Sequence, residues 1–93
     1  MHYTYALVSQ PDKRISTGST KDLRNRVREH AEGRIRSTAY RRPVTLIYYK
    51  ACLSADDALR RERFLMTGKG KRYLRHRLTS FFAGIRDKKL ERY

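Results

Sequence analysis

Apolar, aromatic and β-branched residues gather in three short stretches of the chain, a composition typical of β-strands. These stretches are residues 3–8, residues 14–17 and residues 44–49. The segment between the first two contains Pro11, which favours a turn, so these strands are expected to pair as an antiparallel hairpin. Together with the third stretch, which is the most strongly β-prone, they predict a small three-stranded antiparallel sheet.

A glycine-containing segment and an amphipathic helix follow the hairpin. Residues 17–20 read Thr-Gly-Ser-Thr, so we expect a turn in which Ser19 or Thr20 caps the helix. The helix is expected over about residues 22–32, and Gly33 is a usual terminator. Its apolar positions recur at helical spacing and are Leu23, Val27 and Ala31.

A second helix is predicted to begin after Ser54, a residue type that caps helix N-termini. At about 100° per residue, one side of this helix collects the apolar residues Ala55, Ala58, Leu59, Leu65 and Met66. Glu62 falls in the middle of that same side. A carboxylate buried there costs several kcal/mol unless a cation, a metal ion or hydrogen-bond donors pair with it.

The remaining segments are predicted to be loops and shorter helices. Residues 34–42 are expected to form a polar, basic loop, and residues 67–72 a basic loop hinged by glycines. A third helix is expected over residues 73–79, and a fourth can begin at Ser80. Residues 87–93 are expected to be frayed.

Length and charge narrow the class of protein. A chain of 93 residues allows one domain, which we place over residues 1–93 with a core over about 3–78 and a helical tail over 79–93. Its 23 Lys and Arg against 9 Asp and Glu give a net charge of +14, too basic for an ordinary enzyme of small neutral substrates. This balance favours a nucleic-acid partner, and the seven tyrosines can stack on bases.

The single cysteine and the hydropathy pattern exclude other classes. Cys52 alone can form neither an intrachain disulfide nor a cysteine-rich zinc site. No apolar run has membrane-spanning length, and no signal-peptide pattern is present. We therefore expect a cytoplasmic, nucleoid-associated protein with no membrane partner.

Four residues predict phosphodiester chemistry: Tyr5 on the first strand, Arg26 and His30 on one face of the first helix, and Glu62 on the second. One carboxylate with several waters suits Mg²⁺ (or Mn²⁺), which can polarise a phosphate. The arginine can stabilise transition-state charge. A phenol or an imidazole can accept the proton of the attacking water.

Short motifs along residues 3–78 make the chain resemble the GIY-YIG nuclease family, in particular small stand-alone members similar to the catalytic module of the bacterial excision-repair incision subunit. The motifs are YTY at 3–5, STG at 16–18, DLRNR at 22–26, EH at 29–30, RRP at 41–43, LIYY at 46–49 and ALRRE at 58–62. The resemblance implies a GIY-YIG-like α/β fold and an endonuclease, with DNA repair as its setting. It also implies a catalytic Arg26, an active-site Tyr5 and a metal-binding Glu62.

One position departs from the family pattern, because Ser16 stands where the second motif ordinarily carries a tyrosine. Serine is too short to fill a phenol's place, and its hydroxyl is a poor base. Three outcomes stay open: proton transfer by Tyr5 or His30, a centre that binds but cuts slowly, or a water in the gap. The main hypothesis is therefore a Mg²⁺-dependent DNA endonuclease, and the alternative is a DNA- or RNA-binding module with a weakened or inactive centre.

A further set of basic and aromatic residues is expected to contact nucleic acid, with a solvated basic surface as the alternative. The set is Tyr40, Arg41, Arg42, Lys69, Lys71, Arg72 and Arg75. So small a domain has little surface for reading a long sequence. Single-stranded or branched DNA is therefore the expected substrate rather than a long duplex, and RNA is a further candidate.

Overall fold

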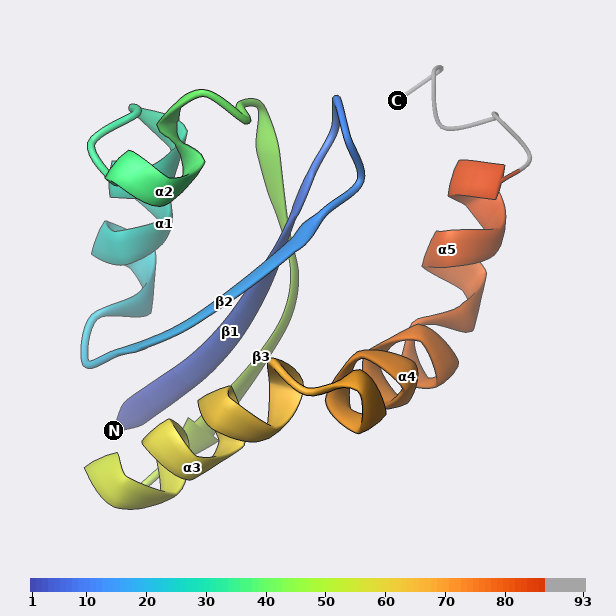
Figure 1. Ribbon diagram of the computed structural model, residues 1–93. Coiled ribbons are helices and arrows are strands. Elements are labelled where there is room, and N and C mark those ends of the chain that lie inside the picture. The colour runs from blue at the N-terminus through green and yellow to red at the C-terminus, as the bar shows by residue number, and fades with distance from the viewer. Residues whose placement is uncertain (87–93) are drawn as a thin grey trace.

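The computed structural model describes residues 1–86, which form a three-stranded sheet and five helices. Figure 1 shows these elements along the chain. The strands are β1 (His2–Ser9), β2 (Ile15–Thr20) and β3 (Val44–Cys52). The helices are α1 (Leu23–Ala31), α2 (Arg36–Ala39), α3 (Ala55–Leu65), α4 (Gly68–Arg77) and α5 (Thr79–Arg86).

The sheet has β1 at its centre, in the order β2-β1-β3, and both pairings are antiparallel. Tyr5 on β1 lies opposite Gly18 of β2 and opposite Tyr49 of β3. The antiparallel sheet with flanking helices confirms the predicted fold class. Because β2 is an edge strand, side chains from both faces of the sheet can meet along its outer side.

Helices cover both faces of the sheet, with α1 and α2 on one side and α3 and α4 on the other (Figure 1). Side chains along a strand point alternately to the two faces. Accordingly, the Thr4 hydroxyl donates a hydrogen bond to the carbonyl of Ala58 in α3, whereas the next residue, Tyr5, contacts His30 in α1.

The main apolar core lies between the sheet and the α3–α4 pair. Ala6, Leu65 and Leu74 are fully buried at its centre. Partly buried side chains surround them, namely Ile15, Ile47, Tyr48, Phe64, Tyr73 and Leu78. Full burial of a leucine stabilises a fold by about 1.5–3 kcal/mol. This packing fixes α3 on the sheet and thereby sets the position of Glu62.

Residues 17–20 belong to β2, so the expected turn was wrong. The ladder to β1 continues as far as Thr20, which lies opposite Tyr3. Strand pairing satisfies the backbone groups that a turn would have left to side-chain caps. The cap of α1 is Asp22 rather than Ser19 or Thr20, and its Oδ1 accepts a hydrogen bond from the backbone N–H of Asn25 at 3.1 Å.

The basic segment 67–72 is also ordered differently from the prediction, because it starts α4. Thr67 caps this helix and accepts a hydrogen bond from the N–H of Gly70 at 3.0 Å. Gly70 is buried against the end of α3, where a Cβ atom would overlap the carbonyl oxygen of Phe64. The glycine therefore permits close helix packing rather than a flexible hinge.

Several other helices and strands differ from the prediction only in where they begin or end. The expected loop 34–42 contains the one-turn helix α2, and β3 continues beyond the predicted strand to Cys52, which is half-buried. The predicted third helix divides between the end of α4 and the start of α5. The predicted frayed segment 87–93 lies outside the described residues. No helix among residues 1–86 is long and apolar enough to cross a membrane.

The second predicted helix is α3, and its cap is confirmed, because the Ser54 hydroxyl oxygen accepts from the N–H of Asp56 at 3.1 Å. The buried stripe of α3 is narrower than predicted. Ala58 and Leu65 are buried, but Leu59 and Met66 are 38% and 59% exposed. The sheet contacts only the part of the helix that faces it, so the outer apolar residues remain in solvent.

Candidate active site

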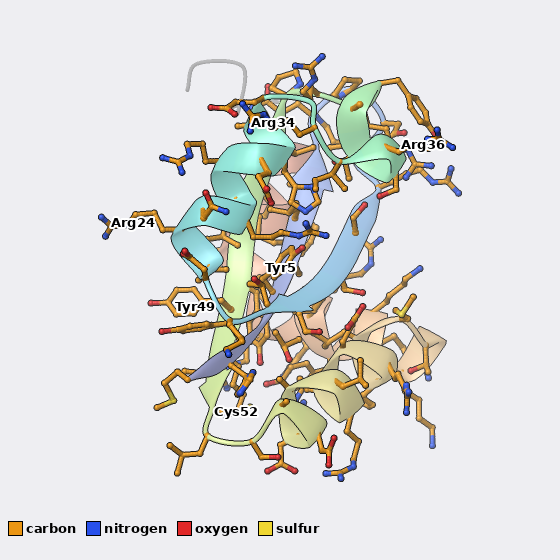
Figure 2. All side chains as sticks on the ribbon, turned by 90° about the vertical axis from the view of Figure 1, so that its left-hand side faces the viewer. Tyr5, Arg24, Arg34, Arg36, Tyr49 and Cys52 are labelled. Atoms are coloured by element: carbon orange, nitrogen blue, oxygen red, sulfur yellow. The ribbon has the colours of Figure 1, made fainter. Side chains whose placement is uncertain are left out.

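The centre of the site is a contact between β1 and α1. The hydroxyl of Tyr5 lies 2.9 Å from Nε2 of His30, and their rings meet edge to face with centroids 5.6 Å apart. Both side chains are buried, at 3% and 4% exposure. Figure 2 shows Tyr5 beneath α1 in the middle of this face. The structure therefore brings together two of the residues singled out from the sequence.

The second ring nitrogen of His30 contacts Thr38 on α2. Nδ1 lies 2.8 Å from the Thr38 hydroxyl, which in turn lies within 3.5 Å of the carbonyl of Ile35. Thr38 is 1% exposed. No signal in the sequence pointed to this contact, because residues 34–42 resemble an irregular loop. A continuous chain of hydrogen bonds thus runs from Tyr5 through His30 to Thr38.

The environment of the pair determines the direction of these hydrogen bonds. Burial raises the pKa of Tyr5, although the nearby Arg26 guanidinium opposes part of that rise. Burial also lowers the pKa of His30, and the positive charge of Arg26 lowers it further. The Thr38 hydroxyl donates to the Ile35 carbonyl and therefore accepts from Nδ1–H, which leaves Nε2 of the neutral imidazole to accept from the Tyr5 phenol. His30 therefore presents a basic nitrogen to Tyr5.

Gly18 makes room for the Tyr5 ring on the neighbouring strand. A Cβ atom at this position would lie 2.5 Å from the phenol oxygen and 2.6 Å from the ring carbon that carries it. Neither distance occurs between unbonded atoms of a stable fold. The glycine of the second motif therefore lets the Tyr5 phenol extend over β2, which the turn interpretation did not foresee.

Arg26 lies beside the Tyr5 phenol at the margin of α1. Its Nη1 forms an ion pair with Oε1 of Glu29 at 3.2 Å, and 40% of the side chain is exposed. Its Nε–H is buried and has no hydrogen-bond partner within the described part of the chain. Arg26 therefore pairs with Glu29, one helical turn away on the same face, and not with Glu62.

Glu62 reaches the edge of the sheet from α3. The hydroxyl of Ser19 donates a hydrogen bond to its Oε1 at 2.9 Å, and the side chain is half-buried between the positions of Ala58 and Leu65. The negative charge of Glu62 contributes to the raised pKa of Tyr5, so the two groups share one electrostatic environment. Strand alternation places Ser19 on the α3 face, a relationship that the turn interpretation missed.

The acid content of the site limits how a metal ion can be held. Residues 1–86 contain no group of three or more His, Cys, Asp or Glu side chains that could enclose a metal. The Ser19 hydrogen bond engages only one oxygen of Glu62, and the carboxylate is partly open to solvent. This donor set fits Mg²⁺, which is commonly held by one or two carboxylates together with waters and phosphate oxygens.

Ser16 lies on β2 opposite Leu7 and is half-buried. It is two residues from Gly18 and therefore on the same face of the strand as Tyr5. The small Ser16 side chain thus lies on the Tyr5 face of the sheet, two residues along β2 from the position opposite Tyr5.

The expected nucleic-acid contacts divide into two groups on opposite sides of the sheet. Tyr40, Arg41 and Arg42 follow α2, with Tyr40 76% exposed and the Arg41 guanidinium 5.4 Å from its ring centroid. The other group lies on α4 (Figure 1) and consists of the exposed side chains of Lys69, Lys71, Arg72 and Arg75. The sheet separates them, so they do not form one continuous surface.

Comparison with known proteins agrees with this geometry. The GIY-YIG catalytic domain matches residues 1–75. A UPF0213 protein of Staphylococcus saprophyticus is 36% identical over 67 residues, covering 71% of this chain and 80% of its own. A UPF0213 protein of Staphylococcus aureus is 35% identical over 75 residues, covering 80% of this chain and 90% of its own. No solved structure matches significantly. The chain therefore belongs to the GIY-YIG family, and this membership indicates a nuclease that acts on DNA.

Proposed function

We propose that the protein is a metal-dependent endonuclease that hydrolyses phosphodiester bonds in single-stranded or branched DNA. The observation that carries the proposal is the buried contact of 2.9 Å between the Tyr5 hydroxyl and Nε2 of a neutral His30. A buried phenol that donates to a neutral imidazole is arranged for proton transfer. For packing alone, a phenylalanine ring would serve nearly as well.

Arg26 is proposed to bind the scissile phosphate. Its buried Nε–H has no partner within residues 1–86, and its guanidinium lies beside the Tyr5 phenol. A phosphate oxygen at this position would satisfy the unpaired donor. The fixed positive charge would then stabilise the additional negative charge that develops on the phosphoryl group in the transition state.

Tyr5 and His30 are proposed to move the proton of the attacking water. His30 Nε2 takes the phenolic proton, and the Tyr5 oxygen takes a proton from the water as its oxygen attacks phosphorus. The bond from phosphorus to the leaving sugar oxygen breaks in the same displacement, and the proton held by His30 then passes through solvent to that oxygen. The raised pKa of Tyr5 makes its phenolate oxygen a strong acceptor for the proton of the water.

Glu62 is proposed to hold Mg²⁺ (or Mn²⁺) at the edge of β2. Such an ion supplies charge stabilisation for the phosphate and the leaving oxygen. Ser19 orients the carboxylate through Oε1, and the packing of Leu65 fixes the helix that carries it.

A second candidate function is a DNA- or RNA-binding module whose catalytic centre is weak or inactive. Ser16 is the observation that favours it, because the family's second-motif tyrosine is replaced on the same face as Tyr5. The charge of +14 supports nucleic-acid binding under either function.

The two functions are separated by a cleavage assay on labelled single-stranded, duplex and branched DNA and on RNA, with Mg²⁺, Mn²⁺ or a chelator. We expect metal-dependent products from single-stranded or branched DNA, strongly reduced products with Glu62→Gln and Arg26→Ala, and unchanged products with Glu32→Gln. Glu32 is a matched control because it lies at the exposed C-terminal end of α1, paired with Arg34.

Each result of this assay has a definite meaning. If the parent protein yields no products from any substrate, the binding module is the better function. Cleavage by Glu62→Gln at the parent rate would contradict the metal-binding role. Equal cleavage of duplex, single-stranded and branched DNA would contradict the proposed substrate class.

A further inference from the structure

A groove separate from the catalytic centre lies between the start of α1 and β3. It has a volume of about 460 Å³, and apolar side chains of Leu23, Val27 and Leu46 line it. Tyr49 forms part of its wall and is 57% exposed, although it is a large aromatic residue in the middle of a strand. An aromatic ring left in solvent beside an apolar groove loses burial free energy unless a ligand covers it.

The orientation of this aromatic wall is fixed by its neighbours. The ring of Tyr3 packs edge to face against Tyr49, with centroids 6.3 Å apart and an angle of 60° between the ring planes. An edge contact of this kind restrains Tyr49 without covering the whole of its flat surface. Tyr49 therefore presents a restrained aromatic ring to the groove.

Sheet register relates the groove to the catalytic centre. Gly18, Tyr5 and Tyr49 lie opposite one another across the three strands, so the active-site phenol and the exposed ring share one row of the sheet. The helix α1 lies over this face. Its Leu23 and Val27 line the groove, whereas its His30 contacts Tyr5. The groove and the Tyr5–His30 contact thus lie along the same helix and the same face of the sheet.

The rim of the groove carries positive charge. Lys21 and Arg24 both line it, both are exposed, and neither forms an ion pair with a described residue. Figure 2 shows Arg24 and Tyr49 on the same margin of the molecule. Asp22 is the one acid in the lining, and its carboxylate is engaged as the cap of α1. The surroundings of the ring therefore suit an apolar group attached to phosphates.

We propose that this groove binds an unpaired nucleobase of single-stranded DNA, stacked on Tyr49, with the flanking phosphates on Lys21 and Arg24. This inference rests on the proposed function, because it takes DNA to be the substrate. A base within a duplex is covered by its neighbours on both faces, so only an unpaired base can stack on a protein ring. The groove thus supplies the preference for single-stranded or branched DNA.

The test is a binding cycle that changes the protein and the DNA together. Affinity of the parent and of Tyr49→Ala is measured by fluorescence anisotropy for a thymidine oligonucleotide and for an abasic strand of the same length. A chelator is present, so that no cleavage is needed. We expect the parent to bind the thymidine strand about 5- to 150-fold more tightly than the abasic strand, and Tyr49→Ala to lose most of this difference.

Control variants separate stacking from loss of structure. Tyr49→Phe keeps the ring and should retain the preference for bases, while Leu53→Ala removes a side chain that is 86% exposed outside the groove and should have no effect. Arg24→Ala should weaken binding of both strands and reduce the slope of log affinity against log salt by about 0.7. Circular dichroism checks that each variant is folded.

The groove proposal is overturned if Tyr49→Ala binds both strands as the parent does, or if the parent does not distinguish thymidine from abasic strands. This result is independent of catalysis. A parent protein that fails to cleave any DNA, yet shows the expected binding cycle, would contradict the nuclease and retain the groove.

Discussion

The Tyr5 hydroxyl and Nε2 of His30 lie 2.9 Å apart in the interior of the protein, although 25 residues separate them in the sequence. The contact joins the central strand to the first helix. It also depends on two residues that have no catalytic chemistry of their own, Gly18 beneath the phenol and Thr38 behind the imidazole. Substitution of either residue should therefore disturb the pair without removing a reacting group.

Thr38→Val should slow cleavage because Nδ1–H of His30 loses its hydrogen-bond acceptor. Without that acceptor, the imidazole no longer prefers the tautomer whose unprotonated Nε2 faces Tyr5. A hydrogen bond of about 1.4 kcal/mol corresponds to a tenfold change in rate. We expect a loss of about tenfold or more in single-turnover cleavage. Nitrogen-15 NMR of the His30 ring should show a mixture of tautomers, while Thr38→Ser should restore both the rate and the spectrum. An unchanged tautomer in the Thr38→Val variant would contradict the positioning role.

Gly18→Ala should displace the Tyr5 phenol, because the added methyl group would lie 2.5 Å from its oxygen. Loss of a positioned proton-transfer group typically slows a reaction by about 10²–10⁴-fold. The matched control is Gly68→Ala, since a Cβ there lies 3.8 Å from its nearest neighbour, on Arg72. Cleavage rates of the two folded variants should therefore differ widely, and similar rates would argue against the close approach.

The free energy of unfolding should decrease as the pH falls below about 6.5. Burial lowers the pKa of His30 in the folded protein, so the unfolded chain binds a proton first as the pH falls. This contribution to the free energy of unfolding is fully present above the unfolded-state pKa of His30, about 6.5, and it is lost as the pH falls through the lower folded-state pKa. Urea titrations across this window should show a steeper loss in the parent than in His30→Gln. Parallel curves would contradict the depressed pKa.

Ser16→Tyr should increase the rate of cleavage. The position lies on the same face of β2 as the Tyr5 phenol and corresponds to the second-motif tyrosine of the family. A phenol there would add a hydroxyl group near the proposed proton path, whereas serine is too short to reach it. Single-turnover rates of the parent and the variant on one labelled substrate provide the measurement. An equal or lower rate for the folded variant would show that this chain functions without a group at that position.

Gly70→Ala should destabilise the packing of α4 on α3, because its Cβ would overlap the carbonyl oxygen of Phe64. Overpacking of this kind costs about 1–3 kcal/mol. Thermal unfolding followed by circular dichroism should show a lower midpoint than for Gly68→Ala, whose added methyl group makes only an ordinary contact with Arg72. Equal midpoints would contradict the role of Gly70 as a packing residue.

The local elements and the candidate chemistry could be read from the amino-acid sequence alone. Runs of β-prone residues located the strands, helical spacing located α1 and α3, and Ser54 was recognised as a cap. These features depend on neighbours close in the chain, so local propensity and periodicity reveal them. The ordered motifs indicated the family, and the residue pattern singled out Tyr5, Arg26, His30 and Glu62.

The groups that these residues contact become visible only in the folded protein. Ser19 rather than Arg26 holds Glu62, and Thr38 binds the second nitrogen of His30. The two groups of expected nucleic-acid contacts, after α2 and on α4, fall on opposite sides of the sheet, and Gly70 lies in a helix contact instead of a hinge. Such pairings arise from strand register and from helix packing between segments far apart in the sequence. A local pattern carries no record of them, because the same pattern is compatible with many arrangements until the sheet and the core fix one.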